Sequence, residues 1–212
     1  SVTGGSLTTA AYGGLVVNNK PSATTGDAAK NTVAISGGTV AAAYGADVRT
    51  KDGNATENTA DITGGTVTNV YGAALTAANA TGKIEKSKVN ISAGNVTGNV
   101  YGGSITNAAA TGSITESTLN LTGGSVGGSV YGGKNEGTGS ATGSTLNLYG
   151  GTVTGDVYGG HIAQANATGN ITGSTLNLTG GSVGGATYAA YNGGSGDAKD
   201  SIINITGGAL HD

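Results

Sequence analysis

The stretch that decides the fold is Gly123–Gly133, which reads GGSVGGSVYGG. Six of its eleven residues are Gly, and only Val126, Val130 and Tyr131 carry sizeable side chains. The motif returns along the chain with Tyr as its marker, at intervals of 32, 27, 30, 30, 27 and 30 residues. The marker residues are Tyr12, Tyr44, Tyr71, Tyr101, Tyr131, Tyr158 and Tyr188. Because self-similarity at a near-constant period marks a repeat protein, we expect an array of similar units.

Within a unit the apolar residues alternate. In STLNLTGG, which begins at Ser117, Leu119 and Leu121 flank Asn120, and Val126 and Val130 further on share the same parity. This period of two, on short segments bounded by Gly, predicts short strands joined by tight turns. No stretch shows helical spacing over ten residues, and abundant Gly opposes helix.

A unit of three short strands is too small to bury its own apolar face, but stacked copies of it can do so. The sequence therefore predicts an all-β fold, a parallel β-solenoid of about seven coils with 27–32 residues per coil. We expect a right-handed β-helix, because parallel crossovers have this bias.

Equivalent residues of successive coils should form columns. One aliphatic column is expected to be a core ladder: Ile91, Leu121, Leu148, Leu178 and Ile205. A weaker inward column consists of Val48, Leu75, Ile105 and Ile162. An outward ladder is expected from Asn90, Asn120, Asn147, Asn177 and Asn204. The Tyr column has the opposite parity to its neighbouring Val column, so it should lie outward or at a corner. We favour a structural role for stacked rings, with contact to sugar rings or to a partner surface as the alternative.

The whole chain, 1–212, is expected to be a single solenoid domain. Residues 15–30, which include the only Pro, are expected to form a protruding loop. No separate caps are seen, and the chain starts and ends at nearly the same phase of the repeat. Two explanations stay open: a segment of a longer solenoid, or ends that stack on neighbouring copies to form a fibre.

Composition limits the possible partners. Charged residues make up 10% of the chain, the net charge is −3, and no basic stripe is present, so nucleic acid is not an expected partner. No apolar run is long enough for membrane insertion by this segment. The absence of Cys fits an exported protein, although it is also compatible with other locations.

No catalytic, cofactor-binding or metal-binding residue is predicted. Gly128–Lys134 matches a phosphate-binding loop, but Asn135 follows where Ser or Thr is needed, and no helix follows. His161 and His211 are the only histidines and have no convergent partners in the sequence. The N-x-S/T sequons are interpreted as products of the repeat. Thr-x-Thr pairs occur at Thr66–Thr68 and Thr152–Thr154, but Ser125–Gly127 and Ser182–Gly184 break the column, which argues against ice binding.

The units GGTVTGDVYGG, GGSVGGSVYGG and STLNLTGG resemble repetitive passenger regions of bacterial autotransporter adhesins and related large β-solenoid surface proteins. The resemblance covers nearly the whole chain. It implies a Gram-negative-type envelope, export through an outer-membrane barrel, a right-handed β-helix, and roles in adhesion, aggregation or biofilm. No functional residue of that family maps onto a position of this chain.

The expected function is therefore that of a non-enzymatic extracellular structural or adhesive module at the bacterial cell surface. Its expected partners are further copies of itself or surface glycans and proteins. The alternative is a fibre subunit whose open ends stack head to tail. A polysaccharide-acting β-helix enzyme and an ice-binding protein are the less favoured alternatives.

Overall fold

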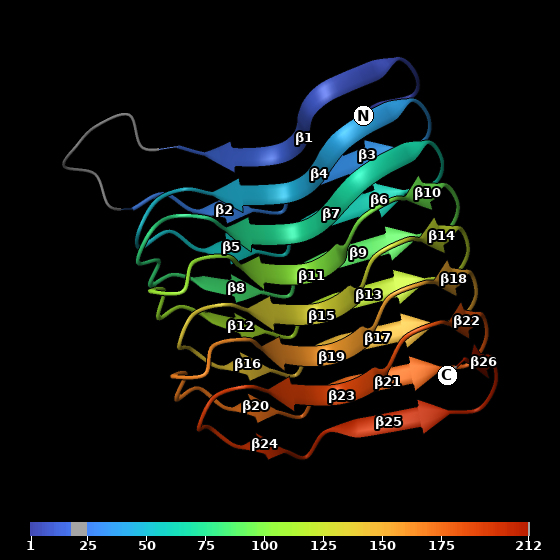
Figure 1. Cartoon of the computed structure of the whole chain (residues 1–212). Helices are drawn as coiled ribbons and strands as arrows, with labels where there is room; N and C mark the ends of the chain where they lie inside the picture. Colours follow the sequence, from blue (N-terminus) through green and yellow to red (C-terminus); the bar gives the residue numbers. More distant parts are fainter. Residues whose placement is uncertain (18–24, 212) are drawn as a thin grey trace.

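The computed structural model describes residues 1–17 and 25–211 as β-strands, turns and loops, with no helix in these ranges. The strands form three parallel sheets that run the length of the molecule (Figure 1). The predicted all-β parallel solenoid of about seven coils is thereby confirmed. In Figure 1 the front strands run toward the left and the rear strands toward the right while the chain descends, so the coil is right-handed.

The rear sheet, which we call sheet A, contains one strand from each coil. Its strands are β3 (Thr32–Ile35), β6 (Thr59–Ile62), β9 (Lys88–Ile91), β13 (Thr118–Leu121), β17 (Thr145–Leu148), β21 (Thr175–Leu178) and β25 (Ile202–Ile205). They pair in order and in register, so that Leu119 lies beside Leu146 and Asn120 beside Asn147. The STLNL segment of the sequence is thus the repeating strand of this sheet.

The front sheet, sheet B, has twelve strands. Three of them are long and continuous: β1 (Ser6–Val16), β4 (Thr39–Val48) and β7 (Thr66–Leu75). In later coils the equivalent segment is split into a short and a long strand. The short strands are β10 (Asn95–Val96), β14 (Ser125–Val126), β18 (Thr152–Val153), β22 (Ser182–Val183) and β26 (Ala209–Leu210). The long ones are β11 (Val100–Ile105), β15 (Val130–Asn135), β19 (Val157–Ile162) and β23 (Thr187–Asn192).

The third sheet, sheet C, is built from very short strands. They are β2 (Ala28–Ala29), β5 (Ala55–Thr56), β8 (Lys83–Glu85), β12 (Ser113–Thr115), β16 (Ala141–Thr142), β20 (Ile171–Thr172) and β24 (Ala198–Lys199). Ala141 lies beside both Ile114 and Ile171. The shorter coils therefore keep this strand with Ala in place of Ile. The coil with Ala141 lacks three residues of the corner that precedes this strand, since Ile105 pairs with Asn135 and Ile114 with Ala141.

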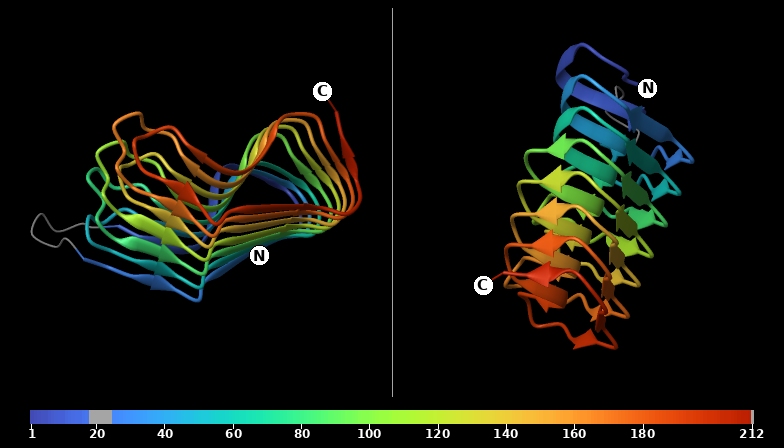
Figure 2. Two further views of the ribbon diagram at one scale, coloured as in Figure 1. Left: turned by 90° about the horizontal axis from the view of Figure 1, so that it is seen from below. Right: turned by 90° about the vertical axis from the view of Figure 1, so that its right-hand side faces the viewer.

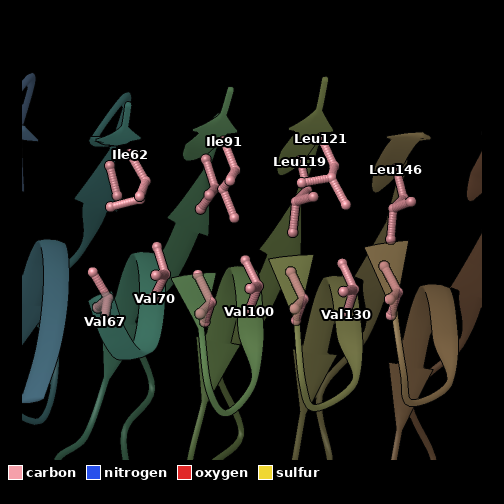
Figure 3. Close-up of a cluster of buried hydrophobic side chains, with 14 of the residues drawn as sticks. Ile62, Val67, Val70, Ile91, Val100, Leu119, Leu121, Val130 and Leu146 are labelled. Carbon is pink, nitrogen blue, oxygen red and sulfur yellow. The ribbon is translucent and has the colours of Figure 1, made fainter. Parts of the chain in front are cut away.

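Each coil has a bent outline when seen along the axis (Figure 2), and the buried side chains form separate clusters. The larger cluster packs sheet A against the first half of sheet B, where rows such as Leu119 and Leu121 face Val100 and Val130 (Figure 3). The smaller clusters pack sheet C against the second half of sheet B, with Ile105 and Ile114 in one of them. Aliphatic burial of this kind contributes about 1.5–3 kcal/mol for each large side chain.

The predicted core ladder lies in one column of sheet A. Ile91, Leu121, Leu148 and Leu178 are at most 1% exposed. Ile205 pairs with Leu178 in the same column but is 51% exposed, so its expected burial is wrong. The reason is that β25 lies at the edge of sheet A and no described strand covers its far side.

The weaker inward column contains residues that were not predicted. Ile105 pairs with Asn135, and Asn135 pairs with Ile162, so a fully buried Asn stands between two isoleucines. Its amide nitrogen donates to the carbonyls of Gly112 (3.0 Å) and Gly139 (2.9 Å), and its Oδ1 accepts from Gly137 N–H at 2.8 Å. Asn192 repeats this arrangement in the last coil through Gly169 and Gly194. Both residues precede corners that are three residues shorter than those after Ile105 and Ile162. Their amides satisfy backbone N–H and C=O groups of these corners.

Two corners depend on left-handed backbone. In the turn between sheets A and B, the second Gly of each pair has positive φ, for example +81° at Gly124. In the turn between sheets C and A, one left-handed residue recurs in every coil, and several of these are charged: Lys30, Glu57, Lys86, Glu116, Gly143, Gly173 and Asp200. Lys30 pairs with Glu57 (3.8 Å) and Lys86 with Glu116 (4.0 Å) across coils. These exposed pairs stabilise the stack only weakly.

The segment 15–30 is only partly described. Leu15 and Val16 belong to β1, and Ala28–Ala29 form β2, so both ends of the segment expected to protrude are strand. Residues 18–24, including Pro21, lie outside the described residues.

Candidate functional site

The tyrosine column stands on sheet B, and its seven rings form a continuous ladder. Register pairs Tyr101 with Tyr71 on one side and with Tyr131 on the other. Successive ring centroids, from Tyr12 to Tyr188, lie 4.4–5.2 Å apart with interplanar angles of 2–15°. The ring spacing follows the strand spacing of about 4.8 Å, because one ring comes from each coil. We call this set of seven residues the Tyr ladder.

Stacking determines which part of each ring is accessible. Every ring between Tyr44 and Tyr158 has a neighbouring ring over both faces. A sugar that packs on an aromatic residue needs a free ring face, and along the ladder only ring edges are available. Burial raises the pKa of the Tyr71 and Tyr101 hydroxyls, so these rings stay uncharged at ordinary pH. The geometry therefore favours the structural role of the Tyr ladder over contact of its rings with glycans.

The column three residues after each Tyr is an additional feature of this surface. Its later members are Ser104, Lys134, His161 and Tyr191, which pair in register from β11 to β23. Lys134 Nζ lies 5.2 Å from the Tyr131 ring centre and 5.9 Å from that of Tyr101, and it contacts Glu136 at 2.7 Å. Burial lowers the pKa of Lys134, but the hydrogen bond and charge of Glu136 outweigh this, so its pKa lies above the usual value.

His161 is surrounded by rings. Its imidazole meets Tyr158 (4.7 Å) and Tyr131 (5.4 Å) edge-on and stacks on Tyr191 at 5.1 Å between centroids. Its Nδ1 is buried and has no hydrogen-bond partner. Burial lowers the pKa of His161 to about 4, and the positive charge of Lys134 lowers it as well. Glu136, the acidic group nearby, acts in the opposite direction but is outweighed. The imidazole is therefore uncharged at neutral pH.

We expect this histidine to make the solenoid sensitive to acid. The unfolded chain takes up the proton at a pKa near 6.5, whereas the folded chain takes it up only near 4. The folded state therefore loses stability as pH falls from about 6.5 toward 4, and keeps it above that range. His161→Ser installs the residue of the same column in β11 and should lose less stability than the native chain between pH 7 and pH 5. Urea-unfolding midpoints at the two pH values measure this, and an equal drop in both proteins would contradict it.

A buried carboxylate occupies this column in an earlier coil. Asp47 is 1% exposed and accepts from Arg49 Nε at 2.8 Å and from Thr76 Oγ1 at 2.7 Å. Arg49 also donates to the Tyr12 hydroxyl at 2.9 Å. The buried carboxylate of Asp47 is thus paired with a cation and a hydroxyl group. Through Thr76 it contacts the next coil, and through Arg49 it is linked to Tyr12, the first ring of the Tyr ladder. Its role is therefore structural.

The Asn column forms the predicted ladder on the outer side of sheet A. Each amide nitrogen donates to the side-chain oxygen of the preceding coil: Asn120 to Asn90 (2.9 Å), Asn147 to Asn120 (2.8 Å), Asn177 to Asn147 (2.7 Å) and Asn204 to Asn177 (2.8 Å). The series begins at Asp61, which accepts from Asn90 at 2.7 Å. We call the five asparagines the Asn ladder.

A further set of side chains caps backbone groups between the two parts of sheet B. The oxygens of Asn69, Asn99, Ser129 and Asp156 each accept an N–H of the next coil, at 2.7–3.1 Å. Asp156 also accepts from the Tyr158 hydroxyl at 3.0 Å. These contacts satisfy N–H groups at the breaks between strands, where the Gly residues interrupt the ladder.

The other residues considered from the sequence do not converge. Lys134 of the Gly128–Lys134 match lies in β15 and contacts Glu136. His161 lies among tyrosines, whereas His211 lies just beyond β26. Within 1–17 and 25–211 there is no group of three or more His, Cys, Asp or Glu side chains able to hold a metal ion. No helix of the described chain is long and apolar enough to cross a membrane.

Comparison with protein-family models, curated proteins and solved structures found no match for this chain. The structure itself defines the class, which is that of parallel β-solenoid repeat proteins. In this chain, the Tyr ladder on sheet B and the Asn ladder on sheet A are the longest repeated side-chain arrays described above.

Proposed function

We propose that this chain is a non-enzymatic structural and adhesive module of an extracellular bacterial surface protein. The observation that supports the proposal is the repetition of outward side chains from coil to coil, as Asn and Thr columns on sheet A and as the Tyr column on sheet B. A rod of this kind presents many equivalent contact points, and multivalent contact gives firm attachment from weak individual interactions. The resemblance to autotransporter passenger repeats supports the location at the cell surface.

The test is surface display. The chain is fused to an outer-membrane anchor in a bacterial strain that neither aggregates nor forms biofilm. Cells displaying the native chain should settle faster in standing culture and bind more crystal violet on glass. The matched control is Leu121→Asp, which places a charge in the core and unfolds the coils while the surface composition is almost unchanged. Equal settling and equal attachment of the two strains, at equal display, would contradict the proposal.

A fibre subunit is the second candidate, and one observation favours it. The end coils expose aliphatic side chains, with Leu7 (39%) and Leu15 (44%) at one end and Ile203 (40%) and Leu210 (45%) at the other. Open strand edges accompany them and can pair with a further coil. The native chain should then form long filaments in electron micrographs, and Ile203→Lys should abolish them. Short rods at every concentration would contradict this candidate. The enzyme and ice-binding alternatives have no observation in their favour among the described residues.

A further inference from the structure

The outward side of sheet A carries an uncharged surface over three successive coils. It lies over β13, β17 and β21 and includes the residue that follows each strand. Its members are Thr118, Asn120, Thr122, Thr145, Asn147, Tyr149, Thr175, Asn177 and Thr179. We call this set the Asn-Thr face. The inward residues between them are the buried leucines, so the alternation of the strands fixes which side chains point outward.

The Asn ladder holds the centre of this face in a defined conformation. An Asn side chain has two N–H donors and an oxygen with two lone pairs. Within the ladder, Asn120 and Asn147 each use one donor and one lone pair for the neighbouring coils. One N–H and one lone pair therefore stay free on each amide. Because the ladder already fixes the rotamers, a ligand that binds here costs little side-chain entropy.

Tyr149 is the single aromatic residue of the Asn-Thr face. Its side chain is 54% exposed, more than any other tyrosine in the described chain. The equivalent residues of the adjacent coils are Thr122 and Thr179, so no ring stacks on it from either side. Among the described residues, no cation lies over it and no aromatic ring contacts it. Unlike the Tyr ladder, Tyr149 therefore has a ring face available to a ligand.

Charged residues flank the Asn-Thr face at the end nearer the N-terminus. In the Asn column, Asp61 precedes the ladder, and in the Thr118 column Lys88 occupies the preceding coil. No member of the Asn-Thr face is charged at neutral pH. A matching ligand is one with many groups that both donate and accept hydrogen bonds, with apolar C–H patches, and without charge.

We propose that the Asn-Thr face binds uncharged polysaccharide. The Tyr149 ring packs against the C–H face of one pyranose ring, since the negative face of an aromatic ring attracts polarised C–H groups. Asn120, Asn147 and Asn177 hydrogen-bond to hydroxyl groups of the same chain. This inference rests on the proposed adhesive function and names the chemical class of its partner.

The experiment is native gel electrophoresis of the full chain in gels that contain hydroxyethyl cellulose, mannan or dextran, with alginate as a charged polymer. The native chain should be retarded by at least one neutral polymer and not by alginate. Tyr149→Thr installs the residue of the neighbouring coils and should weaken retardation by about tenfold in apparent affinity. The matched control is Tyr191→Ser, which removes another exposed tyrosine on a different sheet and should leave retardation unchanged.

A second variant tests the same surface by gain of binding. Ser92 lies in the Tyr149 column two coils away, at a distance of about 10 Å, and is exposed. Ser92→Tyr adds a second ring and should tighten binding by at least about threefold. The inference is overturned if no neutral polymer retards the native chain, or if Tyr149→Thr and Tyr191→Ser bind alike. Displayed cells that still aggregate while polysaccharide retardation is absent would overturn this inference alone and leave the adhesive function in place.

Discussion

Replacing Gly102 by Ala is expected to destabilise the solenoid by about 3 kcal/mol or more, an unusually large effect for one methyl group. Gly102 lies directly after a ladder Tyr, at the bend of sheet B. A Cβ at this position would overlap the backbone carbonyl oxygen of Gly132 in the next coil. The same holds for Gly45, Gly72 and Gly132, each against the following coil. Because the obstacle is backbone that is fixed in a sheet, it cannot move aside.

The chain itself supports this interpretation. Ala189 takes the place of Gly in β23, and no described strand pairs with the far side of β23. The matched control is Gly103→Ala. A Cβ there would meet side-chain atoms of Ser117 and Ile114, and Ala73 already occupies the equivalent position one coil earlier. Urea unfolding followed by circular dichroism should show a much larger loss for Gly102→Ala than for Gly103→Ala. Equal losses would contradict the account of coil packing.

Asn135→Ile is the second variant with a large expected effect, of about 2–4 kcal/mol destabilisation. Judged from the neighbouring coils alone, the change should stabilise the chain, because Asn135 pairs with Ile105 on one side and with Ile162 on the other. In the structure it leaves the Gly137 N–H and two carbonyl oxygens without their side-chain partner in a buried corner. Unpaired buried polar groups cost more than the added aliphatic burial returns.

The measurement is the free energy of unfolding of the native chain, Asn135→Ile, and Ile105→Asn. The last variant places an amide before a long corner, where these backbone partners are arranged differently, and should also be strongly destabilised. Both changes should thus be harmful although they exchange the same two residue types within one column. An Asn135→Ile protein as stable as the native chain would show that the corner does not depend on the buried amide.

Much of the fold follows from the sequence, because residues that are one repeat apart in the chain become neighbours in adjacent coils. The alternation of Leu119, Asn120 and Leu121 fixes which side of sheet A is buried. The spacing of the Tyr markers fixes the register of sheet B, and the structure brings all seven rings together. Such columns can be found by aligning the repeat with itself, since every coil meets only its neighbours.

The features that escaped prediction depend on tertiary contacts or on corner geometry. The role of Asn135 depends on a corner three residues shorter, and Ala141 was not recognised as the partner of Ile114 and Ile171. The cluster of Lys134 and His161 beside the Tyr ladder arises because sheet B bends, so that residues three apart lie on one surface. The sequence did contain a signal for this column, because its members always stand three residues after a ladder Tyr. The residue type at this position changes from coil to coil, however, so the column was not recognised.

The central claim, that equivalent residues of successive coils lie one strand spacing apart, can be tested directly by pulsed electron spin resonance. The chain has no Cys, so two introduced cysteines are the only labelling sites. Thr59, Thr145 and Thr175 lie in one outward column of sheet A, together with Thr32. Labels at Thr59 and Thr175, four coils apart, should give a narrow distribution near about 19 Å. Labels at Thr32 and Thr175, five coils apart, should give about 24 Å. Broad distributions, or two pairs whose distances do not differ by about one strand spacing, would contradict the stacked solenoid.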